Sequence, residues 1–270
     1  MSRERRAAWP TDPQGRPPHV RVRPGEVAPS VLLPGDPARV DLIASMLEGA
    51  RLVSDTREYR VVNGEYRGVK VTVCSSGIGG PSAEIAMVEL GALGARRIIR
   101  VGGTAALVPS IPLGAVIVNH AMVRAGGTSL AYAPLGYPAA ADPAVVAALL
   151  QAARGAEVPH FTGVGLSTAS YYLGQGRTVP GKELPPGEDL EAWVRRGVIN
   201  VEMEGETVLT LGGVLGIAAG VVLAVHANRA TDAWLEAYES AQARVARVAL
   251  ESLVILAEKG VKGGSDGSGS

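Results

Sequence analysis

The stretch Val198-Ile199-Asn200-Val201-Glu202-Met203-Glu204-Gly205-Glu206 determines how the rest of the chain is interpreted. Its apolar first half predicts a strand, and the residues that follow, 207–211, predict the start of a buried helix. Glu202 and Glu204 are two residues apart, so on an extended backbone their side chains share a face. A carboxylate at the edge of a core is costly unless it is satisfied, and a sugar diol can donate two hydrogen bonds to it. The alternative is an ordinary helix N-terminus, where acidic side chains interact favourably with the helix dipole.

Apolar strand patterns alternate with helical patterns along most of the chain. The strand patterns lie at 30–33, 69–74, 97–101, 115–119, 162–167, 198–200 and 218–225, and the helical patterns at 38–43, 83–93, 144–153, 207–215 and 233–259. We therefore expect one α/β domain with a mixed, largely parallel sheet flanked by helices. It should span residues 19–260, between a disordered N-terminal arm at 1–18 and a disordered Gly/Ser tail at 261–270. A hairpin is expected between Tyr59 and Cys74, with its turn at Asn63-Gly64.

Composition excludes several classes of protein. The 270 residues carry a formal net charge of zero, which argues against a nucleic-acid partner bound through a basic face. The single cysteine, Cys74, excludes an intrachain disulfide and a cysteine-rich metal site. The longest apolar stretch, 211–225, is shorter than the roughly 20 residues that a membrane span needs. We expect a soluble, cytoplasmic protein with no nucleic-acid or membrane partner.

Two arginines close to glycine-rich turns indicate an anion site. Pro34-Gly35-Asp36-Pro37 links a strand to a helix, an arrangement that presents free backbone N–H groups. Arg39 lies in the first turn of that helix, where a cation opposes the dipole, and a bound phosphate would resolve the conflict. Arg100 lies inside an apolar strand, where a guanidinium needs an anion or a carboxylate partner. Simple solvation of Arg39 at the surface is the alternative.

A polar segment, Tyr171-Tyr172-Leu173-Gly174-Gln175-Gly176-Arg177, follows the strand at 162–167. The Gln175 amide offers both a donor and an acceptor, whereas the Arg177 guanidinium offers donors only. Together they can bind a ring amide with adjacent carbonyl groups, which is the edge that uracil presents.

Three of these motifs (residues 34–37, 174–177 and 202–204) and a second glycine-rich turn, Ser76-Gly77-Ile78-Gly79-Gly80-Pro81-Ser82, stand in one order at characteristic spacings. Together they resemble the hexameric nucleoside phosphorylase family, and within it the uridine phosphorylase branch, from about His19 to the final helix. The resemblance implies a pentosyltransferase that catalyses the reversible phosphorolysis of uridine, and of related pyrimidine nucleosides, to the free base and ribose 1-phosphate. Inorganic phosphate would be the co-substrate, and no cofactor is expected.

The resemblance also assigns a role to each matching position. The phosphate group of residues consists of Gly35, Arg39, Arg57, Arg100 and Thr104, with Arg57 lent by a neighbouring subunit. The ribose group consists of His19 (from across a dimer interface), Glu202, Met203 and Glu204. The base group consists of Tyr171, Gln175, Arg177 and His226. The catalytic contributions are expected from Arg177, Gln175, Glu204 and Arg100, without a side-chain nucleophile.

Further positions match a mobile lid and a cation site. Asn228 and Arg229 correspond to the pair that precedes the lid. Glu58, Ile78 and Ser82 correspond to residues that hold a monovalent cation, such as K⁺, between subunits in some members. Residues acting from a neighbouring chain require at least a homodimer, and the family pattern implies a hexamer built as a trimer of dimers.

Two rival functions stay open at this point. A purine nucleoside phosphorylase would need an acidic residue where this chain has Ala227, and a non-catalytic nucleoside-binding homologue would keep the pocket without turnover. One departure favours the second rival: Gly102-Gly103-Thr104 has glycine where the family usually carries a hydroxyl. The phosphate should then lose one hydrogen bond unless Thr104 replaces it.

Overall fold

The computed structural model describes residues 7–263 of the chain. Its strands are β1 (Ser30–Pro34), β2 (Glu48–Thr56), β3 (Tyr59–Tyr66), β4 (Val69–Cys74), β5 (Arg97–Ala106), β6 (Val116–Ala125), β7 (Ala139–Ala140), β8 (His160–Thr168), β9 (Val198–Glu202), β10 (Ala218–Asn228) and β11 (Ala233–Trp234). Its helices are α1 (Pro37–Ala44), α2 (Gly80–Ala92), α3 (Pro143–Gly155), α4 (Leu190–Val194), α5 (Gly205–Leu215) and α6 (Glu239–Gly263), with short 3₁₀ turns at Thr128–Ala131 and Leu173–Gln175.

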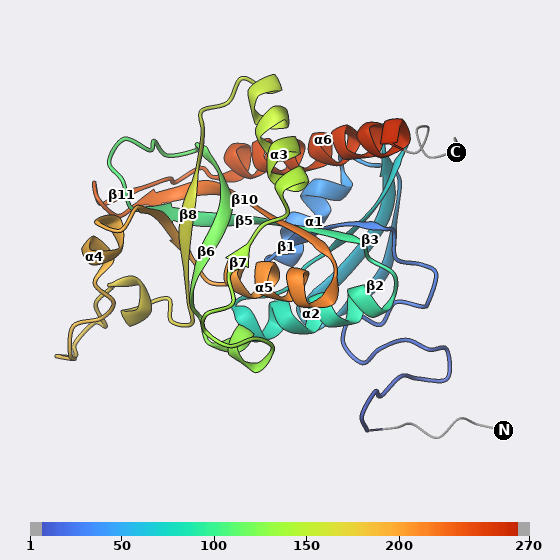
Figure 1. Ribbon diagram of the computed structural model, residues 1–270, viewed down its shortest axis with the longest axis horizontal. Helices are drawn as coiled ribbons and strands as arrows, with labels where there is room; N and C mark the ends of the chain where they lie inside the picture. Colours follow the sequence, from blue (N-terminus) through green and yellow to red (C-terminus); the bar gives the residue numbers. More distant parts are fainter. Residues whose placement is uncertain (1–6, 264–270) are drawn as a thin grey trace, which may run out of the picture.

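The sheet lies between two layers of helices, as Figure 1 shows, with α3 and α6 over one face and α2 and α5 over the other. Apolar side chains fill both interfaces. Leu149 of α3 and Val245 of α6 belong to one buried cluster, whereas Met87 of α2 and Leu209 of α5 belong to the other. Central strands that are covered on both faces are apolar throughout, which explains the continuous hydrophobic run of β10. The expected α/β class with a mixed sheet flanked by helices is confirmed.

The strand order is β11-β10-β6-β8-β9-β5-β1-β4-β3-β2, and β10 also pairs with β5. The strands β5, β10, β6, β8 and β9 therefore form a closed ring of pairings, while β1 to β4 extend the sheet from β5. No helix within residues 7–263 is long and apolar enough to cross a membrane.

Strand β5 changes its partner along one edge. Its residues 97–101 pair in parallel with β1, and Ala105 and Ala106 pair antiparallel with β9. Between them, no strand of the described chain pairs with residues 102–104 on this edge. Ligands bind in α/β sheets at such switches of strand order, beyond the carboxyl ends of the strands.

The segment 7–18, which belongs to the expected disordered arm, differs from that expectation. Asp12 is only 8% exposed, and its carboxylate accepts hydrogen bonds from the backbone N–H groups of Gln14 and Arg16, both at 3.0 Å. The Arg16 guanidinium also pairs with it at 2.6 Å. This local network holds the segment in a defined turn. Residues 1–6 and 264–270 lie outside the described residues, and α6 extends past the expected start of the tail at residue 261.

The expected hairpin forms, but the prediction of its turn at Asn63-Gly64 was wrong. The chain turns at Arg67-Gly68, where φ is +48° and +81°, the pair of positive values that suits a two-residue hairpin. Asn63 stays within β3 because its amide donates to the Glu26 carbonyl at 2.6 Å and accepts from the Thr72 hydroxyl at 2.7 Å. Tertiary hydrogen bonds thus outweigh the local turn preference of the Asn-Gly pair.

The last helix was also predicted to begin too early. It begins at Glu239 rather than at residue 233, because Ala233 and Trp234 form β11 and pair with the end of β10. Trp234 is 54% exposed and lies on this short strand rather than on the expected helix.

Close packing of α3 on the sheet yields a stability prediction. A Cβ atom at Gly220 of β10 would collide with the Val145 side chain of α3. Since overpacking of a filled core costs about 1–3 kcal/mol, Gly220→Ala should lower the free energy of unfolding by that amount in urea titrations. The matched control is Gly155→Ala at the end of α3, where an added Cβ meets nothing within 4 Å. Equal stability of the two variants would contradict the packing described here.

Candidate active site

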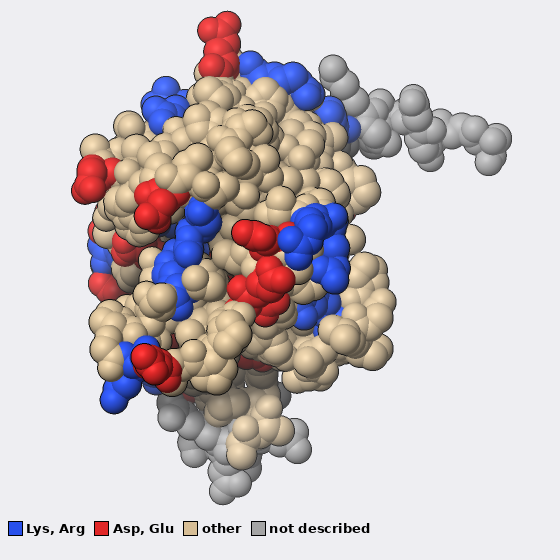
Figure 2. Space-filling view, turned by 90° about the vertical axis from the view of Figure 1, so that its left-hand side faces the viewer, with Lys and Arg blue, Asp and Glu red and all other residues tan. Residues whose placement is uncertain are grey.

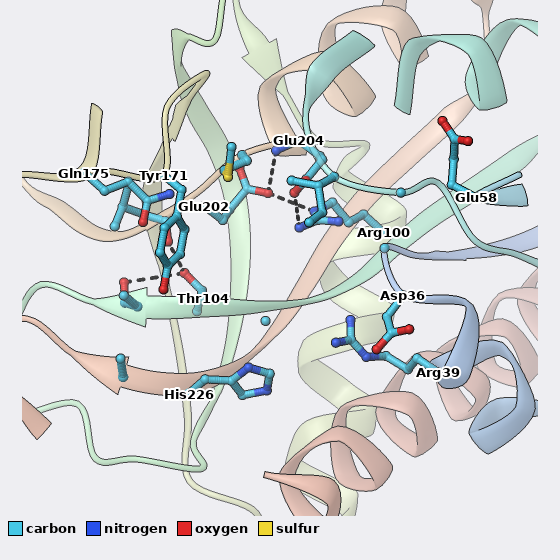
Figure 3. A pocket seen from close by; sticks show the side chains of 18 of the residues that line it. Asp36, Arg39, Glu58, Arg100, Thr104, Tyr171, Gln175, Glu202, Glu204 and His226 are labelled. Carbon is cyan, nitrogen blue, oxygen red and sulfur yellow. Dashed lines mark hydrogen bonds and ion pairs between the residues drawn. The ribbon is translucent and has the colours of Figure 1, made fainter. Parts of the chain in front are cut away.

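A cavity of about 720 Å³ opens at the switch of strand order, within the range of small-molecule sites. Figure 3 shows the side chains that enter it from strands, from α1 and from the loops between these elements. Its walls include most of the residues that the sequence predicted: Gly35, Arg39, Glu58, Ile78, Arg100, Thr104, Tyr171, Gln175, Arg177, Glu202, Met203, Glu204 and His226. Segments far apart in the sequence therefore meet at one place.

Arg100 and the two glutamates form a buried ionic network. The Arg100 guanidinium is 4% exposed, donates from Nε to Glu202 Oε2 at 2.8 Å, and pairs through Nη2 with Glu204 Oε2. Burial alone would lower the pKa of Arg100, but Glu204 and Glu202 raise it, so the guanidinium stays charged. A carboxylate partner, one of the two options open for this arginine, is thus present.

The two glutamates differ in their remaining capacity to accept hydrogen bonds. Glu202 accepts from Arg100, from the Ser167 hydroxyl and from the N–H groups of Glu204 and Gly205, so its lone pairs are used. Among the described residues, Glu204 accepts only from Arg100 and from the Gly79 N–H, the latter at 2.5 Å. A carboxylate has about four acceptor positions. Glu204 therefore retains two of them, one for each hydroxyl of a diol.

Arg39 is a buried cation without a carboxylate partner. It is 9% exposed, its Nη1 donates to the Val101 carbonyl at 3.3 Å, and its Nε has no partner in the described part of the chain. No salt bridge within residues 7–263 involves it. Burial and the positive charge of Arg100 lower its pKa. Asp36 and Glu204 oppose this effect on the pKa, but neither forms an ion pair with Arg39 in the described part of the chain, so its remaining N–H donors can bind an anion.

Gln175 and Arg177 form a rigid unit at another wall of the cavity. Arg177 Nη1 donates to Gln175 Oε1 at 2.5 Å and to the Tyr171 carbonyl at 2.9 Å, and its guanidinium lies over the Tyr171 ring at 3.9 Å. Gln175 is 3% exposed. Because its oxygen accepts from Arg177, its amide N–H groups remain for a ligand. Arg229 donates to the backbone carbonyls of Gln175 and Gly176 and so helps to hold the segment that carries Gln175 and Arg177.

Thr104 has its hydroxyl occupied within the wall. The hydroxyl donates to the Val201 carbonyl at 2.8 Å and accepts from the Asn200 amide at 3.0 Å. The Asn200 amide in turn exchanges hydrogen bonds with Asn119. This buried network joins β5, β9 and β6, and it gives the Thr104 hydroxyl partners other than a ligand.

Several predicted residues do not line the cavity of this chain. His19 pairs through Nδ1 with Glu89 at 2.7 Å, and Arg57 is 70% exposed beside Glu58. The Asn228 amide donates to the carbonyls of Val108 and Ile111. Of the three residues expected at a cation site, Glu58 and Ile78 line the cavity, while the Ser82 hydroxyl donates to the Ile78 carbonyl at 3.0 Å.

Among the cavity residues that the sequence did not assign to the site are one charged and one aromatic side chain, Asp36 and Trp234. Asp36 lines the cavity and also caps α1, accepting from the Ala38 N–H at 2.9 Å. The order Asp-Pro before a helical pattern is a recognisable cap and could have identified it. Trp234 lines the cavity from β11, and only its strand pairing with β10 places it there.

Comparison with known proteins identifies the family of this chain. The model of the phosphorylase superfamily matches residues 29–254. A uridine phosphorylase of Thermococcus kodakarensis is 45% identical over 254 residues, covering 93% of this chain and 91% of the relative. A uridine phosphorylase of Salmonella typhimurium is 41% identical over 201 residues, which cover 73% of this chain and 79% of that protein. The crystal structure of a uridine phosphorylase from Vibrio fischeri superimposes with a TM-score of 0.77 at 31% identity, covering 89% of this chain and 98% of the other. The chain belongs to the phosphorylase superfamily.

Proposed function

We propose that this protein catalyses the reversible phosphorolysis of uridine, which yields uracil and ribose 1-phosphate. One observation carries the proposal. A single cavity combines the Gln175–Arg177 unit, the Glu204 carboxylate with two acceptor positions left, and Arg39, which has no carboxylate partner within residues 7–263. These three features fit a base, a diol and an anion, respectively. The relatives named uridine phosphorylase support the choice of base.

The geometry suggests how each group contributes to the reaction. Phosphate bound near Arg39, Gly35 and Arg100 attacks C1′ of the ribose, and its negative charge stabilises an oxocarbenium-like transition state. Glu204 holds the 2′- and 3′-hydroxyls. Gln175 and Arg177 stabilise the negative charge that develops on the departing uracil, a preorganised electrostatic contribution. No side-chain nucleophile takes part, since phosphate itself forms the new bond as the glycosidic bond breaks.

The site is completed by a second subunit in this proposal. His19, which Glu89 holds through Nδ1, and the exposed Arg57 both lie outside the cavity of their own chain, and we assign each of them to the site of a neighbour. We therefore propose at least a homodimer, with the hexameric trimer of dimers as the expected assembly. Glu58, Ile78 and Ser82 gather around Gly77, and their carboxylate, carbonyl and hydroxyl oxygens suit a monovalent cation such as K⁺ at that interface.

Figure 2 shows acidic and basic side chains interspersed over the face that it displays, without a continuous basic surface. Together with the zero net charge, this distribution favours a small-molecule substrate over a nucleic acid. We also propose that the enzyme works without a cofactor, with inorganic phosphate as co-substrate.

The direct test is release of free base with and without phosphate, across uridine, thymidine, inosine and adenosine. Uracil release that requires phosphate is the expected result. Preference for inosine would favour a purine phosphorylase, binding without turnover would favour a nucleoside-binding protein, and phosphate-independent release would indicate a hydrolase. Each of these three outcomes would refute the proposal.

Glu204→Gln should reduce activity on uridine more than on 2′-deoxyuridine. The carboxylate accepts from the 2′-hydroxyl, which deoxyuridine lacks, and a hydrogen bond to a charged group is worth about 1.5–3 kcal/mol. The ratio of kcat/KM for uridine to kcat/KM for 2′-deoxyuridine should therefore fall about tenfold or more. A weaker pairing of residue 204 with Arg100 would reduce kcat/KM for both substrates equally. The change in the ratio therefore reports only the hydrogen bond to the 2′-hydroxyl. An unchanged ratio would argue against the diol assignment.

Arg177→Ala should lower kcat/KM for uridine by at least ~100-fold, the scale for removing one preorganised donor to developing charge. The control is Arg195→Ala, because Arg195 lies on the surface with a side chain that is 65% exposed. Its kcat/KM should match the parent enzyme. A similar loss in both variants would mean that the effect does not come from base recognition.

A further inference from the structure

His226 is the extra residue of a β-bulge at the end of β10. In the pairing of β10 with β5, Val225 is opposite Thr104 and Ala227 is opposite Ala105, so His226 has no counterpart on β5. A bulge bends the strand and redirects the side chain of the inserted residue. Here the imidazole lines the cavity, and Figure 3 shows its ring pointing to the side where Arg39 lies.

The imidazole occupies the space that any side chain at residue 103 would need. A Cβ built on Gly103 would lie 2.5 Å from Cε1 and 2.6 Å from Nδ1 of His226, which is closer than two such atoms can approach. Gly103 does not have a positive φ, so backbone conformation is not the reason for a glycine there. The imidazole on β10 therefore fits beside β5 only because residue 103 has no side chain.

The two ring nitrogens of His226 have different surroundings. Nε2 is buried without a hydrogen-bond partner in the described part of the chain, and the ring packs against Tyr238 with centroids 5.2 Å apart. A buried N–H without an acceptor is costlier than an unpaired acceptor, which favours the tautomer with the proton on Nδ1. Burial and the positive charge of Arg39 lower the pKa of His226 to about 4, so the ring is neutral near pH 7 and carries this one N–H.

This side of the cavity therefore offers hydrogen-bond donors to a ligand. Arg39 presents a guanidinium that has no carboxylate partner in the part of the chain that the structure describes, and His226 presents Nδ1–H beside Gly103. The expected hydroxyl at residue 103 is missing, and that of Thr104 is engaged with Val201. Phosphate is the acceptor-rich substrate of the proposed reaction, and it matches a set of donors better than a ribose hydroxyl or the uracil ring does.

We propose that His226 is a phosphate-binding residue, whose Nδ1–H donates to the co-substrate phosphate from the space that Gly103 leaves free. This inference rests on the proposed function, because it requires phosphate to bind in this cavity. It also revises the expected role of His226, which the sequence placed with the base-binding residues.

The first test compares the two substrates. His226→Ala should raise the KM for phosphate about tenfold, the scale of one lost hydrogen bond to a charged group, with little change in the KM for uridine. Calorimetric titration with inorganic phosphate alone should show the same loss of affinity. His120→Ala on the exposed part of β6 is the matched control and should leave both constants unchanged.

Conservative variants distinguish the two ring nitrogens. The amide nitrogen of asparagine can occupy the position of Nδ1, whereas that of glutamine reaches the position of Nε2. His226→Asn should therefore retain most of the phosphate affinity, and His226→Gln should behave like His226→Ala. The reverse order would overturn the assignment to Nδ1.

A reciprocal change tests the coupling to residue 103. Gly103→Ser alone should weaken phosphate binding, because its Cβ displaces the imidazole. The double variant Gly103→Ser/His226→Ala should recover phosphate affinity to within a few-fold of the parent, since the new hydroxyl then fills the vacated space. Additive losses in the double variant would contradict the coupling.

The outcomes separate this inference from the proposed function. If the parent enzyme releases no uracil with phosphate, the proposed function fails and the inference fails with it. If the parent is active but His226→Ala changes only the KM for uridine, the function stands and His226 binds the nucleoside instead. If His226→Ala lowers thermal stability without any change in the KM for phosphate, the ring is structural and the inference is overturned.

Discussion

The buried pairing of Arg100 with Glu202 and Glu204 is the interaction on which the site depends. It joins the middle of β5 to the end of β9 and the start of α5, so three elements meet around one guanidinium. Removing one member of such a network leaves a buried charge without compensation, which is strongly destabilising. The same network gives the two carboxylates different roles. All acceptor positions of Glu202 are used by groups of the protein, so its role is structural. Glu204 has acceptor positions left for a ligand.

Sheet topology explains why the cavity lies where it does. Strand β5 exchanges β1 for β9 at residues 102–104, so the backbone of this short segment is open on one edge. The neighbouring strands end at this opening. They bring Arg39 at the start of α1, Glu202 and Glu204 at and just after the end of β9, and His226 of β10 to it (Figure 3). The cavity is thus a consequence of strand order, and the chemistry depends on which side chains stand at the strand ends.

Many features of the fold and the site could be predicted from the sequence, because they depend on local pattern. The alternation of apolar strands and helices predicted the α/β class. The Gln175–Arg177 spacing and the pair Glu202 and Glu204 marked segments that the structure does bring to one cavity. Predictions failed where tertiary contacts outweigh local preference. Asn63 stays in a strand because Glu26 and Thr72 bind its amide, and Trp234 joins a strand because β10 offers an open edge.

The sequence by itself determined which charged and polar groups the protein has for a site: two glutamates, two arginines beside glycine turns, and a glutamine–arginine pair. Only the tertiary structure decided how these groups are divided among partners. It engages the Thr104 hydroxyl with Val201, pairs Arg100 with carboxylates and leaves Arg39 without an ion pair among residues 7–263. It also places the His226 ring over Gly103 through a bulge. The physical reason is that hydrogen-bond capacity and free volume are shared among residues far apart in the chain. Their allocation depends on strand order and register, which no local stretch of sequence contains.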